Sequence, residues 1–273
     1  MRENILYFIV LMLFIFSTIP FYVEVNEINT KLLNIAHRGA SGYAPENTIS
    51  AFDKAIEMNV DYIELDVQMT KDGYLIVIHD PQVNRTTNGK GFIKDLTLNE
   101  IKRLDAGSWY SDDFKGEKIP TFKEILERYA EDVGLLIEIK NPSLYPGIEL
   151  KVAEAISSYT SLTSSNIDIK IQSFDLTSLK ALKVYLPNIE SGLIVKRLIS
   201  YRDLLSLSKN TDFINVQKRF ISRHLVLQAH QLGLKIYAWT INDLQDLKFL
   251  LLLGIDGAIV DYPELIFQTR QIY

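Results

Sequence analysis

Residues 61–80 read DYIELDVQMTKDGYLIVIHD, and this stretch decides the fold. Two apolar runs, 61–69 and 74–79, flank the turn sequence TKDG at 70–73. Because so short a connection leaves no room for a crossover helix, the two runs should pair as an antiparallel hairpin. The second run is therefore not expected to join the parallel strands that the rest of the chain predicts.

From residue 31 onward, strand-like runs alternate with segments of helical period. Besides 74–79, the strand candidates are the eight runs 32–36, 61–67, 134–139, 168–173, 191–195, 212–216, 235–240 and 257–261. Helical patterns occupy 44–56, 121–131, 148–160, 175–185, 198–208, 220–231 and 242–253. Such alternation predicts a parallel sheet covered by helices, and eight parallel strands are the number of a closed (β/α)8 barrel. We therefore predict an α/β fold, a TIM barrel formed by one domain of residues 31–273.

Residues 81–118 interrupt the alternation, and we expect them to form an insertion after the hairpin. A polar stretch at 84–91 is followed by a short helical pattern at 97–104 and by Trp109 and Tyr110. Long inserts in compact domains are usually either functional or disordered. The aromatic residues favour a substrate lid over the mouth of the barrel.

The composition of the 273 residues excludes several classes of protein. Cysteine is absent, which rules out disulfides, thiolate zinc sites and a cysteine nucleophile. The net charge is −5 and no tract of Lys and Arg with interleaved aromatics occurs, so we expect no nucleic-acid partner. Any phosphate must then be met by a few placed cations and a metal. No pattern predicts the oligomeric state.

The first 30 residues form a separate N-terminal segment. Residues 5–23 are apolar except for Ser17, Thr18 and Pro20, and as a helix they would span about 28 Å, close to a bilayer core. Arg2 on one flank and two glutamates on the other predict a cytoplasmic N-terminus, with the domain of residues 31–273 outside. We expect a single-pass signal-anchor in the cell membrane. A cleaved signal, which would give a secreted protein, and a buried helix are the alternatives.

Three short strings place acidic residues in or directly after strand-like runs: ELD at 64–66, HD at 79–80 and EIK at 138–140. Carboxylates at positions i and i+2 of a strand point to the same face, so Glu64 and Asp66 should face the barrel interior together. Buried charges need compensation, which a Lys or Arg partner or a divalent cation can supply. Oxygen ligands alone favour Ca²⁺ or Mg²⁺.

Histidines and cations stand at the ends of predicted strands, where TIM barrels place their active sites. His37 and Arg38 follow the first strand, and His79 ends the hairpin. The histidines could be a general acid and a general base, and Arg38 a phosphate clamp; a capping histidine, a surface arginine and a plain turn are the alternatives. Lys140 either contacts phosphate or only neutralises Glu138. Carboxylates, imidazoles and cations together suit metal-assisted attack on a phosphate ester.

In this order, the motifs resemble the glycerophosphodiester phosphodiesterase family over residues 34 to about 264. The matching motifs are HRG at 37–39, PENT at 45–48, ELDV at 64–67, TKDG at 70–73, HD at 79–80, EIK at 138–140, QSF at 172–174, WTIN at 239–242, DG at 256–257 and DYP at 261–263. The resemblance implies a phospholipase C-like TIM barrel. It also implies hydrolysis of glycerophosphodiesters to glycerol 3-phosphate and an alcohol.

The resemblance further implies a role for each site residue. One divalent metal ion, Ca²⁺ or Mg²⁺, would be held by Glu64, Asp66 and Glu138. The acid–base pair would be His37 and His79. Phosphate oxygens would be held by Arg38 and Lys140, and Glu46 would tune the metal shell or orient a catalytic histidine. The substrate pocket would be lined by Gln172, Phe174 and Trp239.

Two other functions remain open at this stage. A lysophospholipase D-like enzyme or a hydrolase of teichoic-acid-type glycerophosphate polymers would use the same barrel, and an apolar trough near Trp109, Tyr110 and Phe114 would favour a lipid substrate. A catalytically idle extracellular binding barrel is the other possibility. A missing histidine or metal ligand would favour that function, and none is missing.

Overall fold

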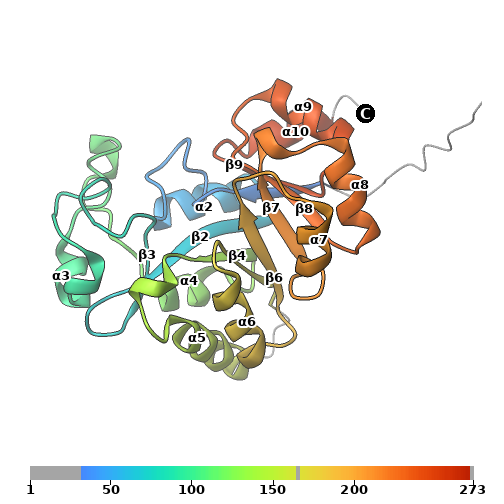
Figure 1. Cartoon of the computed structure of the whole chain (residues 1–273). Coiled ribbons are helices and arrows are strands. Elements are labelled where there is room, and N and C mark those ends of the chain that lie inside the picture. The colour runs from blue at the N-terminus through green and yellow to red at the C-terminus, as the bar shows by residue number, and fades with distance from the viewer. Residues whose placement is uncertain (1–31, 164–166, 271–273) are drawn as a thin grey trace, which may run out of the picture. The chain divides into compact units, whose positions relative to one another are not determined.

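The computed structural model of the chain describes residues 32–163 and 167–270 (Figure 1). The membrane helix expected in residues 1–30 lies outside the described residues. Within the two described ranges, no helix is long and apolar enough to cross a bilayer.

Eight parallel strands form a closed barrel, because β1 pairs with β2 on one side and with β9 on the other. The barrel strands are β1 (Leu33–Ala36), β2 (Tyr62–Met69), β4 (Gly134–Ile139), β5 (Ile169–Ser173), β6 (Glu190–Val195), β7 (Phe213–Gln217), β8 (Lys235–Trp239) and β9 (Gly257–Val260). Each strand pairs with the next one in the chain except where β3 intervenes between β2 and β4. The predicted TIM barrel is confirmed.

The strand β3 (Leu75–Val77) lies antiparallel to β2, with Val67 opposite Val77 and Met69 opposite Leu75. The predicted hairpin is therefore confirmed, although its second strand is shorter than 74–79. Beyond Val77, the Ile78 N–H still donates to the Asp66 carbonyl oxygen at 2.9 Å. This bond keeps the following residue, a histidine, beside the part of β2 that carries the carboxylates.

Helices connect the strands and lie around the barrel (Figure 1). They are α2 (Ile49–Glu57), α3 (Leu98–Arg103), α4 (Phe122–Tyr129), α5 (Ile148–Leu162), α6 (Leu176–Tyr185), α7 (Tyr201–Leu207), α8 (Arg223–Gln231), α9 (Leu244–Leu253) and α10 (Glu264–Arg270). The start predicted for α2, residue 44, is wrong: Thr48 caps the helix, and its Oγ1 accepts the Ala51 N–H at 3.3 Å. A side-chain cap satisfies an N–H that the first turn leaves unpaired, so the helix begins after it.

An apolar cluster of side chains fills part of the barrel interior, and we call it the lower layer because on β2 and β4 it lies nearer the amino ends of the strands than the acidic residues do. It consists of Ile35, Tyr62, Leu136, Phe213, Tyr237 and Ile259. Glycine makes room for its largest ring: a Cβ atom at Gly192 would lie 2.0 Å from ring atoms of Phe213. The layer closes the barrel below the site and excludes water from that side.

The insertion, whose helix α3 is labelled in Figure 1, contributes to a small apolar cluster separate from the barrel core. Ile76 and Ile78 contribute to it from the hairpin, and Ile93, in the 3₁₀ turn η1 (Ile93–Asp95), and Ile101 from the insertion. All four side chains are buried. Because this cluster packs on β3, it holds the insertion against the end of the hairpin that carries a candidate site residue.

Candidate active site

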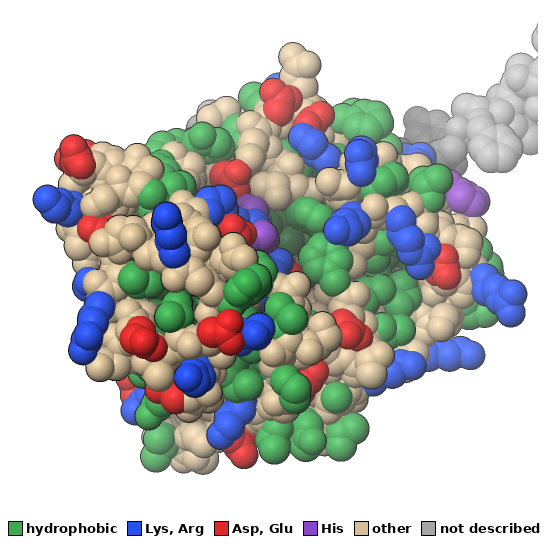
Figure 2. All heavy atoms as spheres, turned by 60° about the vertical axis from the view of Figure 1, so that its left-hand side comes forward, with side chains coloured by type: hydrophobic (Ala, Val, Ile, Leu, Met, Phe, Trp, Pro, Cys, Tyr) green, Lys and Arg blue, Asp and Glu red, His purple; other side chains and the backbone are tan. Residues whose placement is uncertain are grey.

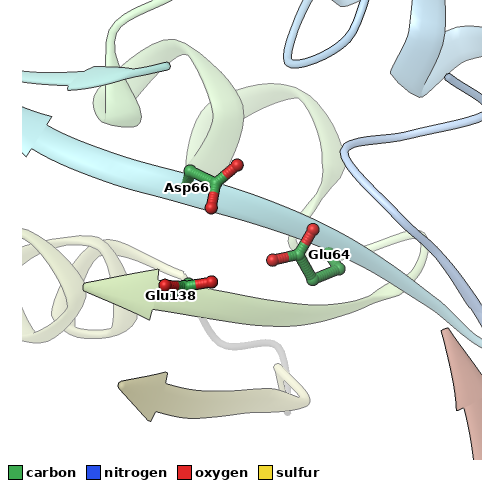
Figure 3. A group of neighbouring side chains, drawn as sticks. All are labelled: Glu64, Asp66 and Glu138. Atoms are coloured by element: carbon green, nitrogen blue, oxygen red, sulfur yellow. The ribbon is translucent and has the colours of Figure 1, made fainter. Parts of the chain in front are cut away.

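Three carboxylates from two neighbouring strands converge inside the barrel. In the β2–β4 pair Asp66 is opposite Glu138, and Glu64, two residues before Asp66, shares its face of the strand. One carboxylate oxygen from each residue lies within 4.8 Å of the other two, and Figure 3 shows the three groups turned toward one another. Their exposed fractions are 2%, 1% and 6% for Glu64, Asp66 and Glu138. The predicted metal ligands are thus brought together.

The electrostatics of this acidic trio (Glu64, Asp66 and Glu138) fit a divalent cation. Burial and the charge of Asp66 raise the pKa of Glu64 well above its usual range, and the same two causes raise the pKa of Glu138 to about 7. Burial would also raise the pKa of Asp66, but the nearby cations Arg38 and Lys140 hold it below its ordinary value. A divalent cation would remove the repulsion that disfavours three charged carboxylates, and oxygen ligands suit Ca²⁺ and Mg²⁺.

Arg38 connects the loop after β1 to the acidic trio. Its backbone N–H donates to Glu64 Oε2 at 2.9 Å, its Nη1 donates to Glu46 Oε1 at 2.7 Å, and its Nε lies 3.5 Å from Asp66 Oδ2. Its φ of 57° is in the left-handed region, which non-glycine residues seldom adopt. These contacts hold the residue in this backbone conformation and place the guanidinium beside the trio.

Lys140 and Gln172 complete the polar surroundings of the trio. The Lys140 ammonium lies 2.7 Å from Glu138 Oε1 and 3.7 Å from Asp66 Oδ1. Although burial opposes it, these carboxylates raise the pKa of Lys140, so the side chain stays charged. Gln172 donates from Nε2 to Glu64 Oε1 at 3.1 Å, and its own Oε1 accepts from Asn215. The predicted pocket residue Gln172 therefore also orients a carboxylate of the trio.

Each predicted catalytic histidine is hydrogen-bonded to a carboxylate through Nδ1. His37 Nδ1 lies 2.6 Å from Asp261 Oδ1, and His79 Nδ1 lies 2.6 Å from Asp80 Oδ1. A carboxylate at Nδ1 fixes the tautomer and ring orientation and leaves Nε2 for a substrate. Burial lowers the pKa of His79, with the charge of Arg38 acting in the same direction and that of Asp66 against it.

Glu46 accepts hydrogen bonds from two arginines, Arg38 and Arg85. Arg85, from the insertion, donates to both Glu46 oxygens at 2.8 Å and, from Nε, to Asp80 Oδ2 at 2.7 Å. These bonds from Arg85 lower the pKa of Asp80 to about 2. Glu46 thereby supports Arg38 on one side and, through Arg85 and Asp80, the ring of His79 on the other.

Three further residues that contact the candidate site were not predicted from the sequence. Arg85 and Asp261 hold other site residues in place, as described above. Asn47 donates from Nδ2 to Asp66 Oδ2 at 2.8 Å, and its Oδ1 accepts the Asp66 N–H at 3.2 Å. Asn47 and Asp261 stand in the PENT and DYP motifs, so a role for them could have been sought there. Arg85 stands in a polar stretch that gives no such signal.

The site opens into a cavity of about 720 Å³ at the carboxyl ends of the strands. Of the predicted site residues, its lining includes His37, Arg38, Glu64, His79, Glu138, Lys140, Gln172, Phe174 and Trp239. The rings of Phe174 and Trp239 meet edge to face with centroids 5.9 Å apart. Figure 2 shows histidine and acidic side chains at the edge of a hollow on one face of the molecule.

The aromatic residues of the insertion lie elsewhere. Trp109 and Tyr110 meet edge to face, as do Tyr110 and Phe114, and the Tyr110 hydroxyl donates to the Gly42 carbonyl oxygen at 2.8 Å. None of these three aromatic side chains lines the cavity. The described structure therefore gives no support to the apolar trough that would favour a lipid substrate.

Comparison with known proteins agrees with this geometry. The sequence profile of the glycerophosphoryl diester phosphodiesterase family matches residues 37–265. YhdW of Bacillus subtilis is 43% identical over 237 residues, which cover 86% of this chain and 96% of the YhdW chain. A glycerophosphodiester phosphodiesterase of Caldanaerobacter subterraneus is 42% identical over 236 residues, which cover 86% of this chain and 96% of its own.

A solved structure is similar as well. The phosphodiesterase of Oleispira antarctica, determined in complex with its product sn-glycerol-3-phosphate, superposes with a TM-score of 0.79 at 31% identity and covers 87% of this chain and 96% of its own. Barrel, site and relatives together define a phosphoric diester hydrolase. The chain belongs to the glycerophosphoryl diester phosphodiesterase family, and its activity is that of a glycerophosphodiester phosphodiesterase.

Proposed function

We propose that the chain hydrolyses glycerophosphodiesters to glycerol 3-phosphate and an alcohol by metal-dependent catalysis, with His37 and His79 as the acid–base pair. The observation that carries the proposal is the convergence of three buried carboxylates, two of which, Glu64 and Glu138, line the cavity that His37 and His79 also line. A divalent cation held by Glu64, Asp66 and Glu138 would act as a Lewis acid toward a phosphate oxygen.

Two cationic side chains, Arg38 and Lys140, bind the phosphate group of the substrate. Arg38 and Lys140 both line the cavity next to the acidic trio, and both remain charged at neutral pH. Their N–H groups can donate to phosphate oxygens, on which negative charge grows as the nucleophile approaches. Because each cation is also paired with a carboxylate, its position is fixed before the substrate arrives.

The two histidines move the protons. One Nε2 accepts the proton of the glycerol hydroxyl next to the ester, and that oxygen attacks phosphorus while the bond to the leaving alcohol breaks. The other histidine, protonated, donates its proton to the departing alkoxide. The attack forms a cyclic glycerol phosphate. Water then opens this ring, with the two histidines exchanging roles, and glycerol 3-phosphate is released. Asp261 and Asp80 keep both rings oriented through their bonds to Nδ1.

Turnover of glycerophosphoglycerol by the purified full-length protein tests the proposal. We expect activity to disappear on chelation and to return with Mg²⁺ or Ca²⁺. We expect His37→Ala and His79→Ala each to lose at least about 100-fold, the low end of what a general acid or base contributes.

A substrate with an acidic leaving group separates the two histidines. An ester of glycerol phosphate with 4-nitrophenol needs no proton on its leaving group, so the variant that lacks the general acid should recover most of its activity. Full activity in the presence of chelator would remove the metal from the proposal. Losses below about tenfold in both variants would remove the acid–base pair.

A further inference from the structure

Lys196 differs from the other cations of the cavity. Arg38 and Lys140 are paired with carboxylates, Glu46 and Glu138, at 2.7 Å. Lys196, which follows β6 directly, also lines the cavity, but among the described residues no carboxylate lies within ion-pair distance of its ammonium. Its side chain therefore brings a positive charge to the cavity that the protein itself does not compensate.

The ring of Phe174 connects Lys196 to the acidic trio. The Lys140 ammonium lies 5.6 Å from the centroid of this ring and the Lys196 ammonium 5.4 Å from it. Both distances are within the range of a cation–π contact. Because two ammonium groups already approach this ring, a third cation, such as the quaternary ammonium of choline, would meet like charges there.

One further carboxylate, that of Asp175, also lines the cavity. Its Oδ1 accepts the N–H groups of Thr177 at 2.7 Å and Ser178 at 3.3 Å and thereby caps α6. A carboxylate that caps a helix is held by the helix N-terminus. Asp175 is therefore held at the start of α6, and Lys196 is left without an ion-pair partner among the described residues.

The burial of the site gives the direction in which a bound diester extends. The acidic trio is almost fully buried, whereas Phe174 is 43% exposed and Lys196 is exposed. The glycerol phosphate group is common to all substrates and would be fixed at the buried end. The leaving alcohol, which varies between substrates, would then lie along Phe174 toward Lys196.

We infer that Lys196 is a specificity-determining residue that favours diesters whose leaving alcohol carries a negatively charged group, such as a second phosphate. The inference rests on the proposed function, since it places the scissile phosphate at the acidic trio. Lys196 would contact the charged group of the alcohol and none of the reacting atoms. An exposed ion pair of this kind changes an affinity about two- to fivefold.

Three glycerophosphodiesters that differ in the charge of the leaving alcohol test the inference: glycerophosphoglycerol phosphate, glycerophosphoglycerol and glycerophosphocholine. For the wild type we expect kcat/KM to fall in that order. In Lys196→Gln the ratio of kcat/KM for glycerophosphoglycerol phosphate to kcat/KM for glycerophosphoglycerol should fall about two- to fivefold, and in Lys196→Glu about tenfold. The change should come mainly from the first substrate, because the leaving alcohol of glycerophosphoglycerol is uncharged. Activity on that substrate also shows that the variants fold.

Arg197→Gln is the matched control, because it removes a neighbouring cation that does not line the cavity and is paired with Asp203 at 3.1 Å. In this variant the ratios of kcat/KM between the three diesters should equal those of the wild type. Preference of the wild type for the choline ester, or unchanged ratios in Lys196→Glu, would overturn the role of Lys196 while leaving the proposed function intact. Absence of turnover on all three diesters by the wild type would overturn both.

Discussion

The lower and upper layers of the barrel interior are built on the same strands but have opposite chemistry. Tyr62 on β2 and Leu136 on β4 belong to the apolar lower layer. Two residues further along these strands, on the same face, stand Glu64 and Glu138. One step of the strand repeat therefore separates residues of the apolar core from residues to which we assign the chemistry.

The two layers also depend on each other. The lower layer excludes water from beneath the acidic trio, which is one reason why burial raises the pKa of Glu64 and Glu138. Three desolvated carboxylates cost free energy in the absence of a cation. We therefore expect substitutions in the upper layer to affect activity more than stability, and substitutions in the lower layer to do the reverse.

The largest effect should come from Glu64→Gln in the upper layer. It keeps an oxygen that can accept the Arg38 N–H but removes a metal-binding charge, so kcat/KM should fall at least about 1,000-fold. In the presence of chelator, the free energy of unfolding should be unchanged or higher, since a repelled, buried charge is lost. Steady-state kinetics and urea denaturation measure the two quantities.

A matched control for this variant is Glu190→Gln. Glu190 is also a strand carboxylate, at the start of β6, and it is paired with Lys170 away from the trio. Activity should stay within about twofold of the wild type. Equal losses in both variants would mean that the acidic trio has no special part in catalysis.

Phe213→Ala tests the lower layer in the same way. Removing a fully buried ring leaves a cavity, and the free energy of unfolding should fall by about 3 kcal/mol. The folded fraction should keep a kcat within a few-fold of the wild type, because the ring belongs to the apolar lower layer and not to the acidic trio. A loss of kcat comparable to that of Glu64→Gln, without unfolding, would contradict the separation of the layers.

The stability of the chelated protein should depend on pH in the direction set by Glu138. Its pKa is raised to about 7 in the folded state, so between its ordinary value of 4.5 and 7 the folded chain binds more protons than the unfolded chain. The free energy of unfolding should therefore fall as pH rises through this window, by on the order of 2 kcal/mol. Urea denaturation at several pH values measures it.

Saturating divalent cation should abolish this dependence or reverse it, because the cation binds the deprotonated carboxylates of the folded state. Glu138→Gln should also flatten the dependence in chelator. A chelated wild type whose stability rises steadily from pH 4.5 to 7 would show that the carboxylates of the upper layer are not held together as described.

Gly192→Ala should have the smallest effect of the series. The added methyl group would meet the Phe213 ring, and overpacking should lower the free energy of unfolding by about 1 to 2 kcal/mol. Combining it with Phe213→Leu should cost less than the sum of the two single changes, since the smaller side chain leaves room. Strict additivity, measured by thermal or urea denaturation, would show that the two residues do not share this space.

Most of the fold and the centre of the site could be predicted from the sequence. The alternation of strands and helices gave the barrel, and the TKDG turn identified the antiparallel β3. The two-residue spacing of Glu64 and Asp66 predicted a shared face because it is a local property of a strand. Glu138 joined them through the motif resemblance, and the β2–β4 register confirms that it lies opposite Asp66.

The contacts that orient the proposed catalytic groups could not be predicted in the same way. Arg85 reaches Glu46 and Asp80 from an insertion without periodic pattern, and Asp261 reaches His37 only because the barrel closes between β1 and β9. These pairings depend on tertiary structure, which leaves no regular spacing in the sequence. The cavity position of Lys196, likewise, follows from the path of the chain after β6.

Calorimetric titration of the chelator-treated protein with Mg²⁺ and with Ca²⁺ measures whether the acidic trio binds a divalent cation. For the wild type we predict that at least one of the two ions binds with one site per chain, and that binding is lost in the Asp66→Asn, Glu138→Gln double variant while Glu190→Gln binds normally. Failure of both ions to bind the wild type, or equal binding by the double variant, would contradict the account.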